Sequence, residues 1–300
     1  MQKAELPVWR SLLFVPVNVP KFVETSADRG ADGIILDLED SVPWAEKAAA
    51  RGMVAEAAKK VGRKGGDVLV RINRPLEHAV RDIEAVVSPE IAGLLLPKID
   101  SASHVRLLCE VIDMVEARKE MPRGHTKISV LIETAEAFPR VEEIAASHPR
   151  LVAVSLGSED FAMDTSSEPA PDTLLYPKQR VIIAAHANKI MPMGVIGSVA
   201  DFSDEAAYRQ AVVRSRRFGI VGSACIHPRI VPILNECFSP SAEEVHWANR
   251  VKEVFAEATS QGRASVQLDG KMIDYPIVER AEKVIDLDNR IKARLARAPA

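Results

Sequence analysis

Residues 33–42, GIILDLEDSV, are the stretch that most strongly predicts the fold of this chain. The run begins at Gly33 and stays mainly apolar up to Leu38, which is typical of a strand buried on both faces. It ends in acids, because Asp37, Glu39 and Asp40 fall within four consecutive residues. Carboxylates this close repel one another unless cations hold them. We therefore expect this strand end to lie at a functional site.

Short runs rich in Val, Ile and Leu recur along the chain, and segments with helical periodicity separate them. Besides 33–38, they cover residues 11–16, 67–73, 93–99, 127–133, 151–157, 192–198 and 219–226. Strands that alternate with helices predict a parallel sheet, because each parallel pair needs a crossover. The number of units predicts a (β/α)8 barrel over residues 1–238. A doubly wound open sheet shares the alternation, but no glycine-rich nucleotide fingerprint follows the first strand.

The composition excludes several classes of protein. With 39 basic and 42 acidic residues in a chain of 300, no polycationic face is indicated, so we expect no nucleic-acid partner. No apolar run approaches the roughly 20 residues of a membrane span, and the first residues lack the pattern of a signal peptide. The three cysteines show no metal-ligand spacing, which favours a reducing, cytoplasmic location.

Chemically capable side chains follow several of the predicted strands. In a barrel of this kind the carboxyl ends of the strands meet on one face and carry the active site. Glu133 and Asp160 close neighbouring strands, and paired carboxylates suit Mg²⁺, which also keeps waters or substrate oxygens. The alternative is that both acids cap helices. Lys98 fits either a Schiff-base lysine or a supporting ion pair.

Arg71 closes the third predicted strand in the sequence VRINR. A guanidinium at this place can clamp a substrate carboxylate through two hydrogen bonds. It can equally form an ion pair with the acids that end the second strand, and the two roles are compatible. We expect Glu39 and Asp40 to hold Arg71 and metal-bound waters in position.

Residues 239–300 follow the last predicted strand and helix of the barrel and are not needed to complete it. They predict a helix that opens with serine capping signals, an exposed hairpin or loop at 263–274, and a final helix. An appendage of this kind can dock on another subunit, or it can cover the bottom of the barrel.

An ordered set of motifs resembles the citrate lyase beta-subunit-like family of the HpcH/HpaI aldolase/citrate lyase superfamily. The motifs are RSLLFVP, GIILDLEDSV, VRINR, LLLPKI, LIETAEAF, LGSEDFAMD, CIHPRI and DGKMIDYP. The family also holds malyl-CoA, β-methylmalyl-CoA and citramalyl-CoA lyases. The resemblance implies a (β/α)8 barrel with a C-terminal extension, assembled as a trimer or hexamer. It further implies Mg²⁺-dependent cleavage or formation of a carbon–carbon bond between an acyl thioester and a 2-keto acid.

The resemblance also implies roles for single residues. Glu133 and Asp160 match the metal ligands, with Glu133 also close to the substrate, and Arg71 matches the arginine that binds the keto acid. Asp274 in KMIDYP matches a catalytic aspartate that a lid from a neighbouring subunit carries. Phe14 and Lys21 lie where coenzyme A is bound. The acids Asp37, Glu39 and Asp40 would support these groups.

The sequence thus predicts an oxo-acid lyase that acts on a short 3-hydroxyacyl-CoA such as malyl-CoA or citramalyl-CoA. One alternative is a citrate lyase beta subunit that works on an acyl-carrier-protein thioester. A metal-dependent aldolase acting on free hydroxy-keto acids is a more distant one, and a non-catalytic barrel that binds CoA esters is the third. The sequence departs from the family pattern at Val17 and at 191–202, so it does not define the acyl group.

Overall fold

The computed structural model describes residues 5–200 and 202–297. The chain divides into two compact units, one up to Phe238 and one from Ser239 onward. No helix in the described ranges combines the length and apolar character needed to span a membrane.

The first unit is built on eight parallel strands within the described residues. Their bounds are β1 Ser11–Pro16, β2 Gly33–Asp37, β3 Asp67–Arg71, β4 Gly93–Leu96, β5 Lys127–Ile132, β6 Leu151–Leu156, β7 Met191–Met193 and β8 Ser223–Cys225. They pair in the order β7-β6-β5-β4-β3-β2-β1-β8. A parallel bridge from Met193 to Gly222 links the two outer strands and nearly closes the ring. The predicted (β/α)8 barrel is confirmed.

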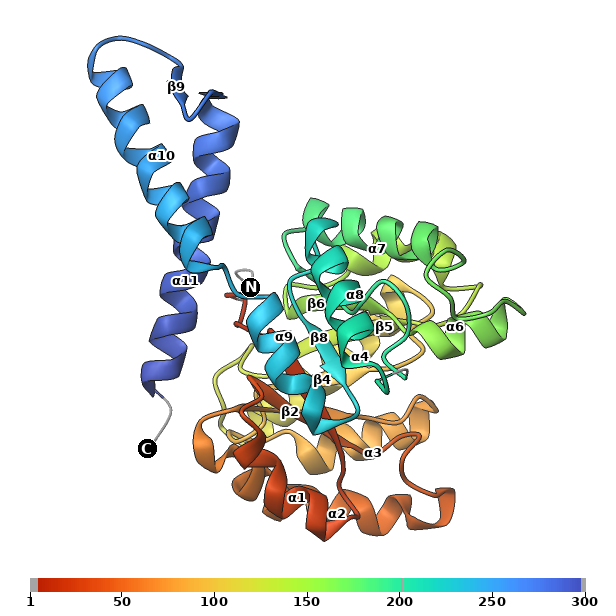
Figure 1. The fold of residues 1–300 in the computed structure, drawn as a ribbon. Coiled ribbons are helices and arrows are strands. Elements are labelled where there is room, and N and C mark those ends of the chain that lie inside the picture. The colour runs from red at the N-terminus through yellow and green to blue at the C-terminus, as the bar shows by residue number, and fades with distance from the viewer. Residues whose placement is uncertain (1–4, 201, 298–300) are drawn as a thin grey trace. The chain divides into compact units, whose positions relative to one another are not determined.

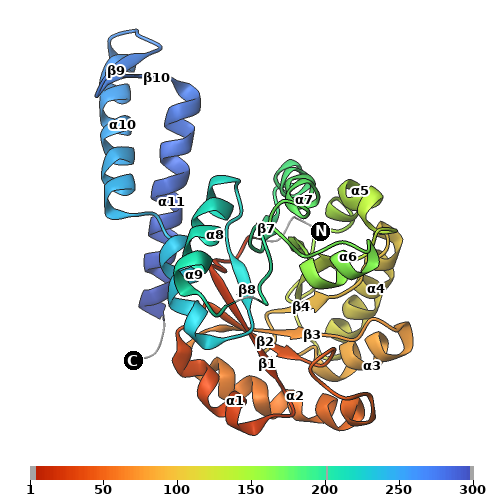
Figure 2. The ribbon, with the colours of Figure 1, turned by 45° about the vertical axis from the view of Figure 1, so that its right-hand side comes forward.

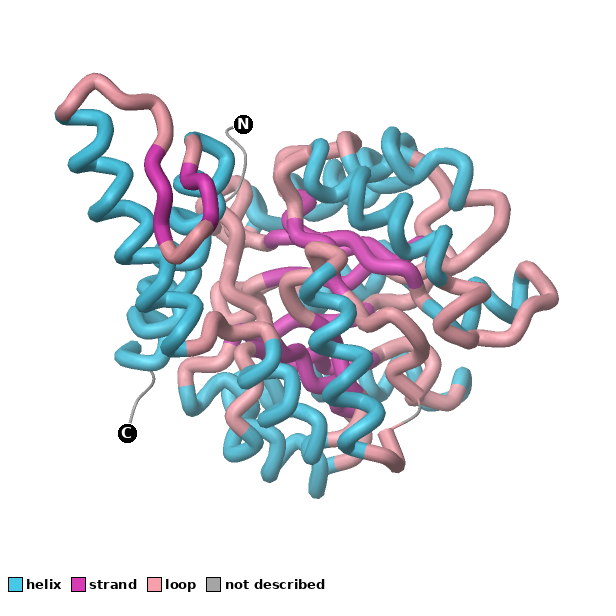
Figure 3. Tube along the Cα trace, turned by 45° about the horizontal axis from the view of Figure 1, so that its top comes forward, coloured by secondary structure: helices cyan, strands magenta, loops and turns pink. Residues whose placement is uncertain are grey.

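Helices alternate with these strands and cover the barrel on its outside (Figures 1 and 3). The α-helices are α1 Pro20–Ser26, α2 Lys47–Val61, α3 Leu76–Val86, α4 Ala102–Arg118, α5 Val141–Ala145, α6 Ser158–Asp164, α7 Leu175–Ala187, α8 Glu205–Arg217 and α9 Val231–Cys237. Short 3-10 turns are η1 Ala27–Arg29, η2 Trp44–Glu46, η3 Gly62–Lys64, η4 Phe138–Arg140 and η5 Pro228–Ile230. Figure 2 shows α1, α2 and α3 on the outer side of β1, β2 and β3.

Two apolar clusters fill the barrel unit. The larger lies between strands and helices and includes Leu36, Val70 and Leu96, which are fully buried. The smaller includes Leu12, Ile35 and Leu69, which alternate along their strands with members of the larger cluster. Because successive side chains on a strand point to opposite faces, each strand feeds both clusters, which explains its continuous apolar sequence.

Several strands are shorter than predicted. The fourth ends at Leu96 because Pro97 and Lys98 follow, and Lys98 adopts a left-handed conformation with φ 48°. In the regions of the predicted runs 192–198 and 219–226, the strands cover only Met191–Met193 and Ser223–Cys225. Gly194, with φ 121°, turns the chain away from the sheet after β7. The residues released after β4 and β7 form loops at the carboxyl ends, whereas residues 219–222 precede β8.

The second unit consists of α10 Ala242–Ser260, a hairpin of β9 Val266–Leu268 and β10 Lys271–Ile273, and α11 Tyr275–Arg297. Ser241 begins α10 with a capping box, as its serine signal predicts. Asp269 and Gly270, with φ 50° and 76°, form the tight turn of the hairpin. Phe255 packs edge-on against Tyr275 at 5.1 Å between ring centroids, so the two helices share a small core.

Candidate active site

A cavity of about 710 Å³ opens among the carboxyl ends of the barrel strands. Its apolar wall includes Phe14, Ile35 and Leu131, and side chains from separate strand ends add polar groups. The polar lining includes Lys21, Asp37, Asp40, Arg71, Glu133, Glu159, Asp160 and Lys178. The barrel therefore brings together Arg71, Glu133 and Asp160, which the sequence places at its strand ends. Asp274, which the sequence places in the C-terminal segment, belongs to the second unit.

Arg71 at the end of β3 is held by the acids that follow β2. Its Nε and Nη2 each donate to the Asp37 carboxylate at 2.7 Å. Its Nη1 lies 3.0 Å from Glu39 and 3.1 Å from Asp40. Burial opposes the charge, but these acids outweigh it and raise the pKa of Arg71. The predicted ion pair with the second strand's acids is present, and it accounts for the carboxylates in GIILDLEDSV.

Further contacts hold the segment that follows β2, and one face of the Arg71 guanidinium, in position. The Ser41 hydroxyl donates to Asp37 at 2.5 Å, and the buried Lys47 ammonium donates to the Leu38 and Glu39 carbonyls at 2.9 and 2.7 Å. The ring of Phe14 lies 4.9 Å from the Arg71 guanidinium carbon. Arg71 is thus positioned by hydrogen bonds from one side and by an aromatic face from another.

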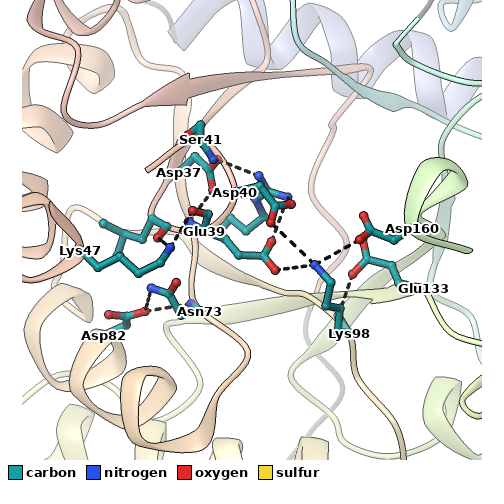
Figure 4. A network of polar contacts seen from close by, with 12 residues as sticks. Asp37, Glu39, Asp40, Ser41, Lys47, Asn73, Asp82, Lys98, Glu133 and Asp160 are labelled. Atoms are coloured by element: carbon teal, nitrogen blue, oxygen red, sulfur yellow. Dashed lines mark hydrogen bonds and ion pairs between the residues drawn. The ribbon is translucent and has the colours of Figure 1, made fainter. Parts of the chain in front are cut away.

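Lys98 lies between Glu39 on one side and Glu133 and Asp160 on the other (Figure 4). Its ammonium lies 2.8 Å from Glu39 and 3.3 Å from Asp160, and its backbone N–H donates to Glu133 Oε2 at 2.7 Å. Burial opposes its charge, but the carboxylates raise the pKa of Lys98 above its usual value. A charged, ion-paired lysine fits the supporting role and does not fit a Schiff base, which needs the neutral amine.

Glu133 is buried beside Asp160 and carries an unfavourable charge. Burial, followed by repulsion from Asp160, raises the pKa of Glu133 to about 7. Gly157, at the turn from β6 to α6, makes room for this carboxylate. A Cβ there would lie 2.4 Å from Glu133 Oε1, so any larger residue would displace the acid.

This pair of carboxylates has the chemistry of a magnesium site. A dication bound by both groups would stabilise two carboxylates that otherwise repel each other in a largely buried position. In the described part of the chain, no three or more His, Cys, Asp or Glu side chains group to hold a metal ion by themselves. The pair fits Mg²⁺, which commonly takes one or two protein carboxylates and completes its shell with waters and substrate oxygens.

Two remaining predicted residues, Lys21 and Asp274, belong to different units of the chain. Lys21 is exposed on α1 and lines the mouth of the cavity. His227, which also lines the cavity, caps η5 by accepting the Arg229 N–H at 3.2 Å, and Pro228 takes the first position of that turn. Asp274 precedes α11, where its carbonyl accepts the N–H groups of Ile277 and Val278 at 3.0 Å.

Sequence reasoning missed Lys178. This lysine lies on α7, lines the cavity and is only 5% exposed. Its ammonium donates to Ser158 Oγ at 2.8 Å. The available signal was its spacing from the buried residues Leu174, Val181 and Ile182, which puts a lysine on the apolar face of a helix.

Comparison with known proteins identifies the family of this chain. The family model for HpcH/HpaI aldolase/citrate lyase matches residues 10–228, and the chain belongs to that family. The family consists of oxo-acid lyases, and this chain is a carbon–carbon lyase of the citrate lyase beta and malyl-CoA lyase type. Both the predicted family and the predicted class of enzyme are confirmed.

Individual relatives cover nearly the whole chain. It is 31% identical over 283 residues to citrate lyase subunit beta of Leuconostoc mesenteroides subsp. cremoris, covering 93% of each chain. It is 30% identical over 301 residues to L-malyl-CoA/beta-methylmalyl-CoA lyase of Rhodobacter capsulatus, covering 92% of this chain and 93% of the relative. A crystal structure of protein CitE from Mycobacterium tuberculosis, in complex with magnesium, acetoacetate and coenzyme A, is similar with a TM-score of 0.72 at 25% identity. That match covers 95% of this chain and 99% of the other.

Proposed function

We propose that this protein is a Mg²⁺-dependent lyase that cleaves, or forms by condensation, a short 3-hydroxyacyl-CoA such as malyl-CoA or citramalyl-CoA. The products of cleavage are an acyl-CoA and a 2-oxo acid. The observation that carries the proposal is a row of contacting charges at the barrel mouth. Glu39 lies between Arg71 and Lys98, and Lys98 in turn contacts Glu133 and Asp160, so cations and carboxylates alternate along the row.

Glu133 and Asp160 would hold the Mg²⁺ ion. When bound, Mg²⁺ supplies Lewis-acid stabilisation of negative charge on the substrate oxygens. Arg71 adds a fixed positive charge for the carboxylate of the oxo acid, and Asp37 keeps its guanidinium in plane. Lys98 balances the acids on both sides of it, so the row keeps its geometry without substrate.

The thioester would bind where β1 meets α1. Phe14 offers an aromatic wall there, and the exposed Lys21 ammonium suits the phosphates of coenzyme A. Asp274 would transfer a proton to or from the carbon next to the thioester. We propose that it acts on the site of a neighbouring subunit in a cytoplasmic trimer or hexamer, and that its segment closes over that site.

A second candidate function is the beta subunit of citrate lyase, acting on an acyl-carrier-protein thioester. Relatives with that name are 31–32% identical to this chain, which favours this reading as much as the malyl-CoA lyases at 30–31% favour the first. A non-catalytic barrel that binds CoA esters is less supported, because binding alone does not need a catalytic row together with Asp274.

The test is a cleavage assay with purified protein. Malyl-CoA, citramalyl-CoA and a citryl thioester of acyl carrier protein are supplied with and without Mg²⁺, and release of the acetyl thioester is followed. We expect Mg²⁺-dependent release from at least one CoA substrate. Release from the carrier-protein thioester alone would support the citrate lyase subunit. Absence of turnover on all three, with binding retained, would support the binding-only barrel.

A further inference from the structure

Lys178 is a buried cation on the wall of the active-site cavity, and no part of the proposed chemistry uses it. Only 5% of this residue is exposed. Within the described residues, no carboxylate lies within 4.0 Å of its ammonium, whereas Arg71 and Lys98 each contact two or more. Its acceptor is the neutral Ser158 hydroxyl, which itself donates to the Gly197 carbonyl at 3.0 Å.

Burying an ammonium with a neutral partner is unfavourable, because charges buried in proteins are normally paired. Burial accordingly lowers the pKa of Lys178 to about 7, although the charge of Glu159 acts in the opposite direction. An anion that entered the cavity beside Lys178 would relieve this cost. The cavity wall thus holds a cation that lacks an anionic partner from the protein.

The position of Lys178 indicates which part of the substrate it can contact. Arg71 lies at the end of β3, and Glu133 and Asp160 follow β5 and β6. Lys178 is tied to Ser158 just after β6 and, through it, to the loop after β7. The order of strands therefore puts Lys178 and Arg71 on opposite sides of the carboxylate pair. A 2-oxo acid held at its carboxyl end by Arg71 would extend its far end toward Lys178.

We propose that Lys178 binds a second carboxylate at the far end of the 2-oxo acid, and so selects dicarboxylic 2-oxo acids and the 3-hydroxyacyl thioesters made from them. This inference rests on the proposed function and bears on the choice among its substrates. Malyl-CoA and citramalyl-CoA would release the monocarboxylic acids glyoxylate and pyruvate, whereas a citryl thioester would release the dicarboxylic oxaloacetate, so the inference favours the citryl group. A methyl group at the same place would leave the ammonium unpaired, which is how a buried polar group rejects an isostere.

The test compares matched acids by isothermal titration calorimetry with saturating Mg²⁺. The pairs are oxaloacetate with 2-oxobutanoate and 2-oxoglutarate with 2-oxopentanoate, which differ only in a carboxylate against a methyl group at the end. We expect wild-type protein to prefer the dicarboxylate by about tenfold or more in at least one pair, as a charge-assisted hydrogen bond provides. Lys178→Met should reduce that preference below about threefold and leave affinity for the monocarboxylate unchanged.

Two further variants serve as controls for Lys178→Met. Lys178→Arg keeps the cation and should keep a preference for dicarboxylates even if Lys178→Met does not fold. Lys59→Met removes an exposed lysine of α2 and the same formal charge, and it should behave as wild type.

Three results would overturn the inference. The first is that Lys178→Met loses affinity equally for the dicarboxylate and the monocarboxylate of a pair. The second is that this variant keeps the full preference for the dicarboxylate. The third is that the wild-type protein itself binds both acids of each pair equally well. If the wild-type protein binds monocarboxylic oxo acids without preference, only this inference fails. If it binds none of the four acids, the proposed function fails with it.

Discussion

At the end of β2 the guanidinium of Arg71 contacts three carboxylates, two of which also lie near the Lys98 ammonium. Asp37 is 1% exposed and its carboxylate contacts Arg71 through both oxygens. Burial would raise the pKa of Asp37, yet the hydrogen bonds and charge of Arg71 bring it below its usual value. Each charge is thus tolerable only because the other is present.

Arg71→Lys should lower kcat/KM by about 100-fold or more, because an ammonium cannot keep two parallel hydrogen bonds to Asp37 and still face a substrate carboxylate. The measurement is steady-state cleavage of the best thioester, with thermal melting as the check on folding. A variant that melts normally and retains activity within about threefold of wild type would remove Arg71 from the proposed site.

The buried Lys178 predicts a pH dependence of stability. Its pKa falls from 10.5 to about 7 on folding, so between these values the unfolded chain binds more protons than the folded one. Stability should therefore rise with pH through this window, and the full cost of burying the charge applies below pH 7. Lys178→Met should be the more stable protein at pH 6.5, with a difference that shrinks toward pH 10.

Chemical denaturation of both proteins at several pH values measures this difference. Parallel curves for wild type and Lys178→Met across the range would contradict the buried, weakly paired state of this lysine.

At the scale of elements, the turn from β6 to α6 sets the position of Glu133. Gly157→Ala should displace the carboxylate, since its Cβ would lie 2.4 Å from Oε1, although the backbone angles of Gly157 suit any residue. We expect metal affinity and activity to fall about 100-fold, as for other ångström-scale shifts in a site. Gly52→Ala on α2 is the matched control, because nothing lies within 4 Å of its added Cβ. Equal behaviour of the two variants would argue against the packing described for Gly157.

Most elements of the barrel could be predicted from the sequence, because parallel strands buried on both faces leave continuous apolar runs. The ends of the last strands could not. There Gly194 and Gly219 adopt positive φ and shorten β7 and β8, although their neighbours are apolar. A local apolar pattern cannot separate a strand from a buried loop.

In the site, too, some residues could be predicted from the sequence and others could not. Arg71, Glu133 and Asp160 could be placed together because strand ends converge in a barrel. Lys178 could not, since its burial follows from how α7 packs beside Ser158, and a single lysine among apolar residues carries little signal. The roles of these residues remain predictions that the experiments address.

For the whole molecule, the proposed sharing of sites between subunits predicts complementation. Arg71→Lys and Asp274→Ala should each lose most of the activity, but a mixed trimer of the two chains should regain about one third of wild-type activity, since one of its three sites then combines an intact barrel with an intact lid. The activity of the mixed oligomer, purified through two different tags, is the measurement. Mixed oligomers that stay inactive would place Asp274 outside a shared site.

A magnesium site on Glu133 and Asp160 is tested by the binding of Mn²⁺, as a paramagnetic substitute for Mg²⁺, measured by electron paramagnetic resonance. We expect one Mn²⁺ site per chain from which Mg²⁺ displaces the ion, and a loss of affinity of about tenfold or more in both Glu133→Gln and Asp160→Asn. Asp172→Asn, which changes an exposed carboxylate, should bind as wild type does. Undiminished binding in the Glu133 and Asp160 variants, or no binding by wild-type protein, would contradict a magnesium-dependent lyase built on these two acids.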